Sequence, residues 1–397
     1  SQLHLFDLEW VYIVKVNYEK FLRLFMIQLF EIYPLLRRLP YKSFCELPTP
    51  VHRLESLGKK LGLTNLFVKR DDISGTEYGG NKPRKLEFIL GKALDKGARS
   101  VMTLGGVGSN HALATAIYAK KLGLKSISML MPQPNANYVR RNLLLSCHYN
   151  AELHLCGTGL GAAFNMPLVR LAIKREQLRH RLLQGYSPYF IPPGGSSALG
   201  AIGFVNAALE LKEQILNGEI PEPEYIYVAC GTMGTAAGLI LGLKAAGLNS
   251  RIIPIRVTSE KLVNRDKMIG LITKTNDLLH SVDNSFPELN FSGEEIDIRH
   301  GFFGEGYAIF TREGMKAVSL MEEFEGIKLE GTYTGKALAA LLDDVKSSKL
   351  NNEVVLFWNT VNSADYSVLI STLDYRKIPR PFHRYFEEEV QPLDKNY

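Results

Sequence analysis

The stretch GGNKPRKLE, residues 79–87, places one lysine after two glycines and an asparagine and directly before a proline. Gly79 and Gly80 allow a sharp turn, and Pro83 suits the first turn of a helix, where its missing N–H costs nothing. Lys82 is therefore predicted at a helix start. There its pKa would fall if the amine is also desolvated, and a neutral amine is what Schiff-base chemistry needs. The alternative is an ordinary solvated lysine at a turn.

Around this stretch, short β-branched runs alternate with longer helical patterns. Strands are expected at 67–69, 100–104, 125–131, 151–155, 225–230, 251–257 and 353–359. Helices are expected at 83–97, 111–123, 138–148, in a stretch ending near 183, and at 198–217, 235–246, 311–325 and 335–347. The alternation predicts an α/β fold with parallel-strand-rich sheets and flanking helices. Ligands in such folds bind beyond the carboxyl ends of the strands, so the loops after strands matter most.

One such loop, CGTMGTAAG at residues 230–238, is glycine-rich and leads into a helix. Glycines let backbone amides gather around an anion, threonine hydroxyls add donors, and the helix start adds positive charge. The loop is therefore a candidate phosphate site, with a plain strand-to-helix turn as the alternative. It has neither the Walker A nor the GxGxxG pattern, which favours a small phosphate ester over a nucleotide. The residues concerned are Gly231, Thr232, Met233, Gly234 and Thr235.

A second loop, GSNHA at residues 108–112, places Ser109 and Asn110 at another helix start. Helix capping is the simplest interpretation, because Ser and Asn are favoured caps. The GxSxG motif of many serine hydrolases is absent. Taken together, a phosphate loop and a Schiff-base lysine predict pyridoxal 5'-phosphate as the cofactor. Asn110 is then placed to bond the hydroxyl of the cofactor ring.

Composition narrows the class of protein. The 397 residues are 46% hydrophobic and 22% charged, with a net charge of +6 that no block of Lys or Arg produces. We therefore expect no nucleic-acid partner. The four cysteines show no CxxC spacing, so we expect no metal site, no disulfide framework and a cytoplasmic location.

The N-terminal stretch 5–36 is apolar but interrupted by charges, and it lacks the features of a signal peptide. An amphipathic helix packed on the protein's own surface or on a partner subunit is expected, with a membrane-surface helix as the alternative and no stable membrane insertion. The true start site stays open.

The motifs occur in an order that resembles the D-cysteine desulfhydrase and 1-aminocyclopropane-1-carboxylate deaminase family. These are pyridoxal-phosphate enzymes of fold type II, with the tryptophan synthase β fold. The resemblance covers about residues 34–359, and GGNKxRKLE is its most specific motif. The segments that carry it are LPTPVHRLESLGKKLG (47–62), VKRDD (68–72), GGNKPRKLE (79–87), GGVGSNHALATA (105–116), CGTMGTAAG (230–238), GEGY (304–307) and YTGKA (333–337).

The resemblance implies a role for each matching residue. Lys82 matches the lysine that carries the cofactor, Asn110 the partner of the ring hydroxyl, and residues 232–235 the phosphate loop. Thr334 matches the residue that faces the pyridine nitrogen. The catalytic positions implied are Ser109, near the substrate carboxylate, and two tyrosines, Tyr307 and Tyr333.

Thr334 separates the two activities of the family. True deaminases resemble YEGK here, where a glutamate keeps the pyridine nitrogen protonated, whereas this chain has YTGK. A hydroxyl gives a weaker electron sink, which suits β-elimination of a good leaving group. His111 and Ala112 also differ from the SNQT of deaminases. D-cysteine is therefore the favoured substrate, to give pyruvate, hydrogen sulfide and ammonia.

Three other functions stay open at this point: deamination of 1-aminocyclopropane-1-carboxylate, a β-replacement synthase, and a catalytically idle cofactor-binding protein. The chain also departs from the family pattern in two loops. Gly331 and Thr332 replace a Pro-Val pair, and Gly108 stands where glutamine is frequent. The bulky Cys230 and Met233 further set its phosphate loop apart from the glycine-rich versions.

The resemblance also implies two domains and a homodimer that acts on a small amino acid. We expect an N-terminal helical extension at 1–33 and a smaller domain at 86–200. The larger, cofactor-binding domain is expected to combine 34–85 with 201–397.

Overall fold

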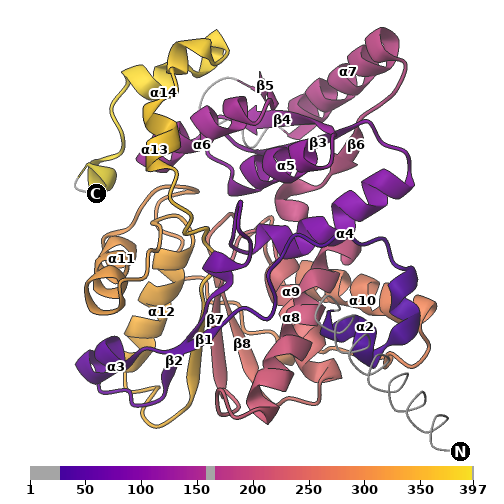
Figure 1. The fold of residues 1–397 in the computed structure, drawn as a ribbon. Helices are drawn as coiled ribbons and strands as arrows, with labels where there is room; N and C mark the ends of the chain where they lie inside the picture. The colour runs from indigo at the N-terminus through magenta and orange to yellow at the C-terminus, as the bar shows by residue number, and fades with distance from the viewer. Residues whose placement is uncertain (1–26, 158–165, 396–397) are drawn as a thin grey trace, which may run out of the picture.

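The computed structural model describes residues 27–157 and 166–395, which form two sheets surrounded by helices (Figure 1). The larger sheet has the order β1 (Val51–Arg53), β2 (Leu66–Lys69), β9 (Val355–Trp358), β7 (Tyr225–Cys230), β8 (Arg251–Arg256), and only β1 is antiparallel. The smaller sheet is parallel throughout, in the order β5 (Glu152–Leu155), β4 (Lys125–Met131), β3 (Ser100–Gly106), β6 (Tyr189–Ile191). The predicted α/β class with parallel-rich sheets is confirmed.

Both faces of the larger sheet are buried. Ile226 and Val228 of β7 belong to one hydrophobic cluster, whereas Tyr227 and Ala229 belong to another on the opposite face. Successive side chains of a strand point to opposite faces, so a strand buried on both sides reads as a continuous apolar run. This is why YIYVAC was recognisable as a strand in the sequence.

Helices cover these faces. Those near the candidate site are α4 (Lys82–Asp95), α5 (Asn110–Lys121), α6 (Asn137–His148), α8 (Ala198–Leu216), α9 (Gly234–Ala245) and α12 (Thr334–Lys346). The others are α2 (Gln28–Ile32), α3 (Glu55–Leu61), α7 (Met166–Gln184), α10 (Arg265–Val282), α11 (Arg312–Glu325), α13 (Ser367–Ser371) and α14 (Arg384–Glu387). Each expected helix and strand is present, except that residues 158–165 of the expected stretch ending near 183 lie outside the described residues. The sequence analysis missed the strands β1 and β6 and the helices α3, α10, α13 and α14.

The described part of the N-terminal extension packs on the protein itself. Leu29 and Phe30 of α2 are buried in the same cluster as α8, and the Leu29 amide donates to Asn206 Oδ1 at 2.9 Å. Packing on the protein's own surface is thus confirmed for α2, while residues 1–26 lie outside the described part. Within residues 27–157 and 166–395, no helix is both long and apolar enough to cross a bilayer.

The predicted domain bounds stay a prediction. The strands of the smaller sheet fall between residues 100 and 191 and those of the larger sheet outside that range. However, α4 and α8 connect the two sheets and pack closely against each other: a Cβ on Gly203 would lie 2.1 Å from the Arg84 carbonyl oxygen.

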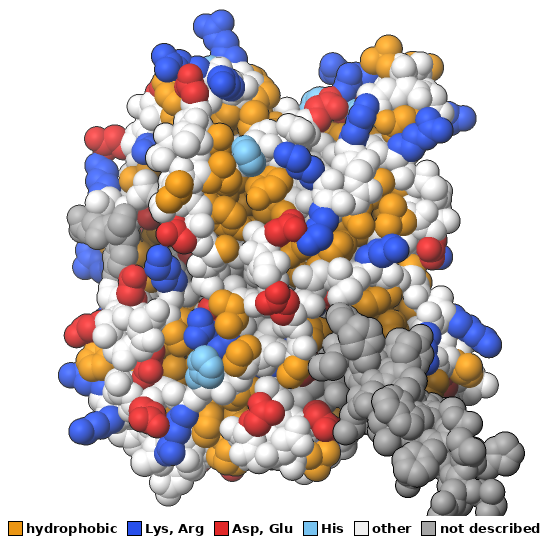
Figure 2. Space-filling model, in the orientation of Figure 1, with side chains coloured by type: hydrophobic (Ala, Val, Ile, Leu, Met, Phe, Trp, Pro, Cys, Tyr) orange, Lys and Arg blue, Asp and Glu red, His pale blue; other side chains and the backbone are white. Residues whose placement is uncertain are grey.

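On the face shown in Figure 2, Lys and Arg side chains lie distributed among acidic ones.

Candidate active site

The turn that precedes Lys82 requires its two glycines. A Cβ on Gly79 would lie 2.1 Å from the Asp72 carbonyl oxygen, and one on Gly80 would lie 2.6 Å from that of Thr360. Gly80 also has a φ of +81°, which favours glycine. The chain thus presses against the loops that follow β2 and β9, and α4 begins at Lys82 as predicted.

Lys82 is held at this helix start by its neighbour. Its Nζ donates to Asn81 Oδ1 at 2.8 Å, and Asn81 Nδ2 donates to Thr235 Oγ1 at 2.9 Å. Asn81 therefore bridges the lysine to the glycine loop, a role that the sequence analysis missed. Burial lowers the pKa of Lys82 from 10.5 to about 8, although the negative charge of Glu330 opposes that shift. The predicted lowering of this pKa is confirmed.

A buried ionic network fixes the helix that carries Lys82. Arg84 donates to Asp71 at 2.8 Å and to Glu210 at 2.9 Å, and Lys69 donates to Glu210 at 2.6 Å. Burial alone would raise the pKa of Glu210, but Arg84 and Lys69 hold it at about 2. Trp358 Nε1 adds a bond to Asp71 at 2.8 Å. The network joins β2, β9 and α8 to α4, the helix that begins at Lys82.

The glycine loop after β7 lies beside a second turn that the sequence analysis missed, residues Pro193–Gly195. A Cβ on Gly194 would lie 2.2 Å from Thr232 Oγ1. The adjoining Ser196 Oγ donates to Thr232 Oγ1 at 2.7 Å and accepts from the Gly234 amide at 3.1 Å. Met233 adopts a left-handed φ of +69° immediately before α9. The loop thus has the sharp, amide-rich form expected of an anion site.

Lys85, one helical turn after Lys82, is a further cation at this loop that the sequence analysis overlooked. Its side chain is buried, and its Nζ donates to the Gly194 carbonyl at 3.3 Å. A Cβ on Gly234 would lie 3.2 Å from the same Nζ. Burial and the charge of Lys82 hold the pKa of Lys85 well below its ordinary value. The three-residue spacing from Lys82 to Lys85, on one face of a helix, was the available signal.

The loop after β3 combines capping with site residues. Ser109 Oγ accepts from the Ala112 amide at 3.2 Å, which confirms helix capping, while its catalytic role stays a prediction. Asn142 donates to Asn110 Oδ1 at 2.8 Å and so orients that amide. His111 is buried, and neither of its ring nitrogens has a hydrogen-bond partner in the described structure. Burial and the charges of the two nearby lysines lower its pKa well below the ordinary value.

The two predicted tyrosines meet each other. Their hydroxyl oxygens are 2.5 Å apart. The Tyr333 ring lies close to Gly231, where an added Cβ would be 3.1 Å from the ring. The Tyr307 ring lies close to Gly106, where an added Cβ would be 3.4 Å from the ring. Burial raises the pKa of Tyr307 and raises that of Tyr333 further. Both phenols are therefore hydrogen-bond donors at neutral pH rather than bases.

Thr334 is buried at the first turn of α12, where Glu330 organises the chain. Thr334 Oγ1 accepts from the Glu330 amide at 2.9 Å. The Glu330 carboxylate accepts from the amides of Thr332, Tyr333 and Thr334 at 2.8, 2.7 and 2.9 Å. A carboxylate at a helix N-terminus satisfies amides that would otherwise lack partners. Glu330 was not singled out in the sequence.

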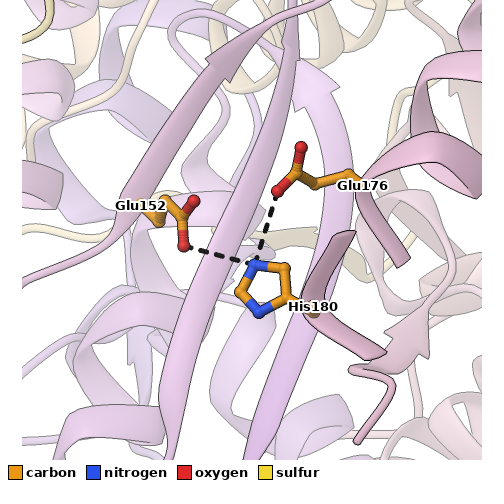
Figure 3. A group of neighbouring side chains, drawn as sticks. All are labelled: Glu152, Glu176 and His180. Atoms are coloured by element: carbon orange, nitrogen blue, oxygen red, sulfur yellow. Dashed lines mark ion pairs between the residues drawn. The ribbon is translucent and has the colours of Figure 1, made fainter. Parts of the chain in front are cut away.

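A separate charged cluster lies away from these loops, between β5 and α7 (Figure 3). His180 Nε2 lies 3.3 Å from a Glu152 oxygen and 3.5 Å from a Glu176 oxygen. The guanidinium of Arg179 donates to both carboxylates and thereby supplies the positive charge that a metal ion would bring. The ion pairs account for this cluster, and the expected absence of a metal stays a prediction.

The arrangement defines a class of protein. The buried Lys82 amine is linked through Asn81 to the glycine loop, and a second buried lysine, Lys85, lies beside that loop. The ring nitrogens of His111 have no hydrogen-bond partner in the described structure, and His111 is near enough to both amines for their charges to lower its pKa. These groups fit pyridoxal phosphate: Lys82 would bond its aldehyde, and Lys85 with residues 231–235 would hold its phosphate. The glycine loop and the neighbouring turn at Pro193–Gly195 pack so closely that neither Gly194 nor Gly234 has room for a side chain.

The chain belongs to the pyridoxal-phosphate dependent enzyme family, whose sequence model matches residues 42–360. Among solved structures it is similar to an ACC deaminase homologue at 30% identity, with a TM-score of 0.70, covering 87% of this chain and 98% of that one. This agrees with the resemblance seen in the motifs.

Two more distant structures share the fold. The processed form of threonine deaminase isoform 2 from Solanum lycopersicum has 16% identity, a TM-score of 0.55 and coverage of 86% of both chains. A pyridoxal 5'-phosphate-dependent aspartate racemase has 15% identity, a TM-score of 0.54 and coverage of 83% of this chain and 92% of that one. The family match and the 30% identical structure establish fold type II and dependence on pyridoxal phosphate for this chain.

Proposed function

We propose that the protein is a lyase that catalyses α,β-elimination of a small amino acid, with D-cysteine as the best substrate. D-Cysteine and water would give pyruvate, hydrogen sulfide and ammonia. The observation that carries this proposal is Thr334, a buried hydroxyl where the deaminases resembled by the sequence place a carboxylate. A hydroxyl does not hold a full positive charge on a ring nitrogen, which favours substrates that carry a good leaving group.

Lys82 supplies the base in this proposal. Pyridoxal phosphate, when bound, provides the electron sink that makes the α-proton of an amino acid acidic. With a pKa of about 8, roughly a fifth of the Lys82 amine is neutral near physiological pH, against about a thousandth of an ordinary lysine, and the neutral form can accept that proton. The raised pKa values of Tyr307 and Tyr333 make either phenol a poor base. Lys82 is therefore favoured over a tyrosine for proton removal.

The tyrosine pair supplies a hydrogen-bond donor rather than a proton, because phenols with raised pKa values are weak acids. The hydrosulfide that leaves the β-carbon carries a negative charge, which such a donor stabilises. Two phenols with oxygens 2.5 Å apart share one hydrogen bond, so one hydroxyl hydrogen stays available to a bound group. Ser109 and Asn110, at the start of α5, are proposed to face the substrate carboxylate and the cofactor ring.

The test is to mix the purified enzyme separately with D-cysteine, L-cysteine and 1-aminocyclopropane-1-carboxylate, and to measure sulfide and keto acids. Pyruvate and sulfide from D-cysteine support the proposal. No turnover of D-cysteine, with the cofactor band present, contradicts it. Turnover only after a thiol is added would indicate a β-replacement synthase, and no turnover of any amino acid would indicate an idle cofactor-binding protein.

The second candidate is deamination of 1-aminocyclopropane-1-carboxylate. The 30% identical structure is that of an ACC deaminase homologue, which favours this activity. The product separates the two, because opening the cyclopropane ring gives 2-oxobutanoate rather than pyruvate. Production of 2-oxobutanoate by the unaltered enzyme would mean that Thr334 is compatible with ring opening.

A homodimer in the cytoplasm is also part of the proposal. The four cysteines are free, as suits a reducing compartment. The homodimer rests on the family resemblance, and light scattering of the purified protein tests it. Cell fractionation tests the location.

A further inference from the structure

The C-terminal segment runs beside α6 (Figure 1) and contacts the loop that carries Tyr307. We define residues 384–394 as the C-terminal strap. It comprises α14 and a short turn at Pro392–Asp394. The strap makes hydrogen bonds on two sides, and Gln391 takes part in both sets.

On the α6 side, the bonds go to the backbone of the strap. Asn135 Nδ2 donates to the carbonyls of Tyr385 and Glu388, both at 2.9 Å. Arg140 donates to the same two carbonyls at 2.8 and 2.7 Å. The Gln391 amide donates to the Asn135 carbonyl at 3.0 Å. The path of the strap is thereby fixed relative to the start of α6.

On the other side, one side chain holds the Tyr307 loop. Gln391 Oε1 accepts from the Phe310 amide at 2.7 Å, and Gln391 Nε2 donates to the Ala308 carbonyl at 3.0 Å. Ala308 is fully buried, with a left-handed φ of +63°. A residue other than glycine keeps this conformation only where its surroundings enforce it. One of the two Gln391 bonds goes to the carbonyl of this strained residue, and the other goes to the amide two residues later.

Ala308 directly follows Tyr307, so holding Ala308 in place fixes the backbone on the C-terminal side of Tyr307. We propose that Gln391 is a positioning residue that holds Tyr307 against Gly106 and Tyr333. The proposal rests on the proposed function, which places Tyr307 in the active site. Because the strap is also bonded to Asn135 and Arg140, it fixes the phenol relative to the segment that leads into α6.

Hydrogen exchange tests the strap without any reference to activity. In Gln391→Met the Phe310 amide loses its acceptor, so exchange of peptides covering 301–310 should accelerate about tenfold or more. Glu389→Gln is the matched control, since this side chain of the same strap is exposed and pairs with Lys395. Unchanged exchange in Gln391→Met would overturn the proposal, whatever the enzyme proves to act on.

A double-mutant cycle tests the link to Tyr307. Gln391→Met should lower kcat on the identified substrate about tenfold, with KM changed less than about threefold. In a Tyr307→Phe background the same replacement should lower kcat little further, because both changes act on the same phenol, that of Tyr307. Fully additive losses would overturn a role through Tyr307. If the wild type turns over no amino acid, the proposed function fails. The hydrogen-exchange measurement alone then tests whether Gln391 holds the Tyr307 loop.

Gln391→Glu provides a variant of nearly the same shape. Its carboxylate still accepts from the Phe310 amide but sets an oxygen against the Ala308 carbonyl. Protonation restores the missing donor, so the activity of this variant relative to wild type should recover as pH falls. A ratio that is independent of pH would contradict the role assigned to Nε2.

Discussion

At the scale of single residues, the molecule depends on how the Lys82 amine is made neutral. The amine lies at the positive end of a helix, and burial lowers its pKa from 10.5 to about 8. In the proposed function the same residue would act both as a nucleophile toward an aldehyde and as a base toward an α-proton. An exposed lysine would be protonated almost completely at neutral pH.

This pKa predicts the pH dependence of cofactor attachment. Below about 8 the amine is increasingly protonated, so reaction of the cofactor-free protein with pyridoxal phosphate should slow about tenfold per pH unit, and it should level off above about 8. Stopped-flow absorbance measures the rate. A rate that continues to rise to about pH 10 would indicate an ordinary exposed lysine instead.

Replacement of Lys82 tests the assignment directly. Lys82→Ala should abolish the absorbance band of lysine-bound cofactor together with turnover, because Lys82 is the residue assigned to that bond. Lys85→Ala should keep the band but bind the cofactor more weakly, since Lys85 is assigned to the phosphate. A Lys82→Ala variant with normal activity, or a Lys85→Ala variant without the band, would reverse the roles of the two lysines.

The sequence predicts site residues where the chemistry is local and misses those that act across the fold. Lys82 and residues 231–235 stand in short continuous motifs, so turn and helix rules locate them. Asn81, Ser196 and Asn142 act through partners far away in the chain, such as Thr235 for Asn81. No local pattern shows such partners, because tertiary packing brings them together.

At the scale of elements, the same limit applies to short strands. β1 and β6 have only three residues each, which is too short for an alternating pattern. The buried strands of the larger sheet were predictable because both of their faces are apolar. α10 differs, since Met268, Ile272, Thr275 and Leu279 do recur at helical spacing on its buried face. That signal was present and was overlooked.

The contact between α8 and α9 depends on glycines that helix propensity would disfavour. A Cβ on Gly238 would lie 2.3 Å from the Ala201 carbonyl oxygen and 2.6 Å from Phe204 Cβ. Propensity alone predicts that Gly238→Ala adds up to about 1 kcal/mol of stability. Overpacking costs about 1–3 kcal/mol and should exceed that gain, so we expect a lower free energy of unfolding.

Gly270→Ala in α10 is the control for this prediction. A Cβ at Gly270 has no heavy atom within 4 Å, so only the gain in propensity remains, about 0.5–1 kcal/mol. Urea denaturation measures both variants. If both replacements change the free energy of unfolding by the same amount, α8 and α9 can move apart to accommodate the added Cβ without loss of stability.

Glu330 is the key residue at the start of α12, where its carboxylate binds three consecutive amides. A glutamine has one acceptor oxygen instead of two, so Glu330→Gln should lose about 1–3 kcal/mol of stability. It should also lower activity, because Tyr333 is one of the residues held. Denaturation and turnover are measured beside Glu323→Gln, an exposed change on α11 that should stay within about 0.5 kcal/mol.

At the scale of the whole molecule, the site draws on both sheets, so it exists only when they are held together. Lys82 and Lys85 start the helix that leads from the larger sheet toward the smaller one. Ser109 and Asn110 come from the smaller sheet, and residues 231–235 from the larger. The Arg84 network, the close packing of α4 on α8 and the C-terminal strap all join these parts.

The N-terminal segment provides the last prediction, because two truncations separate folding from assembly. Removing residues 1–33 takes Ile27, Leu29, Phe30 and Tyr33 out of the core, which should cost about 6–12 kcal/mol at roughly 1.5–3 kcal/mol for each buried side chain. Removing only 1–26 leaves all four in place and should change the free energy of unfolding little. Equal losses from the two truncations would contradict the packing seen for α2.

Light scattering of the same two proteins then tests the role of the segment in assembly. If residues 1–26 take part in subunit contact, the shorter truncation should lower the molar mass while its unfolding free energy stays near that of the full chain. An unchanged mass would count against that role. A loss of mass only after removal of 1–33 would instead follow from the damaged core, because α2 packs against α8 within one chain.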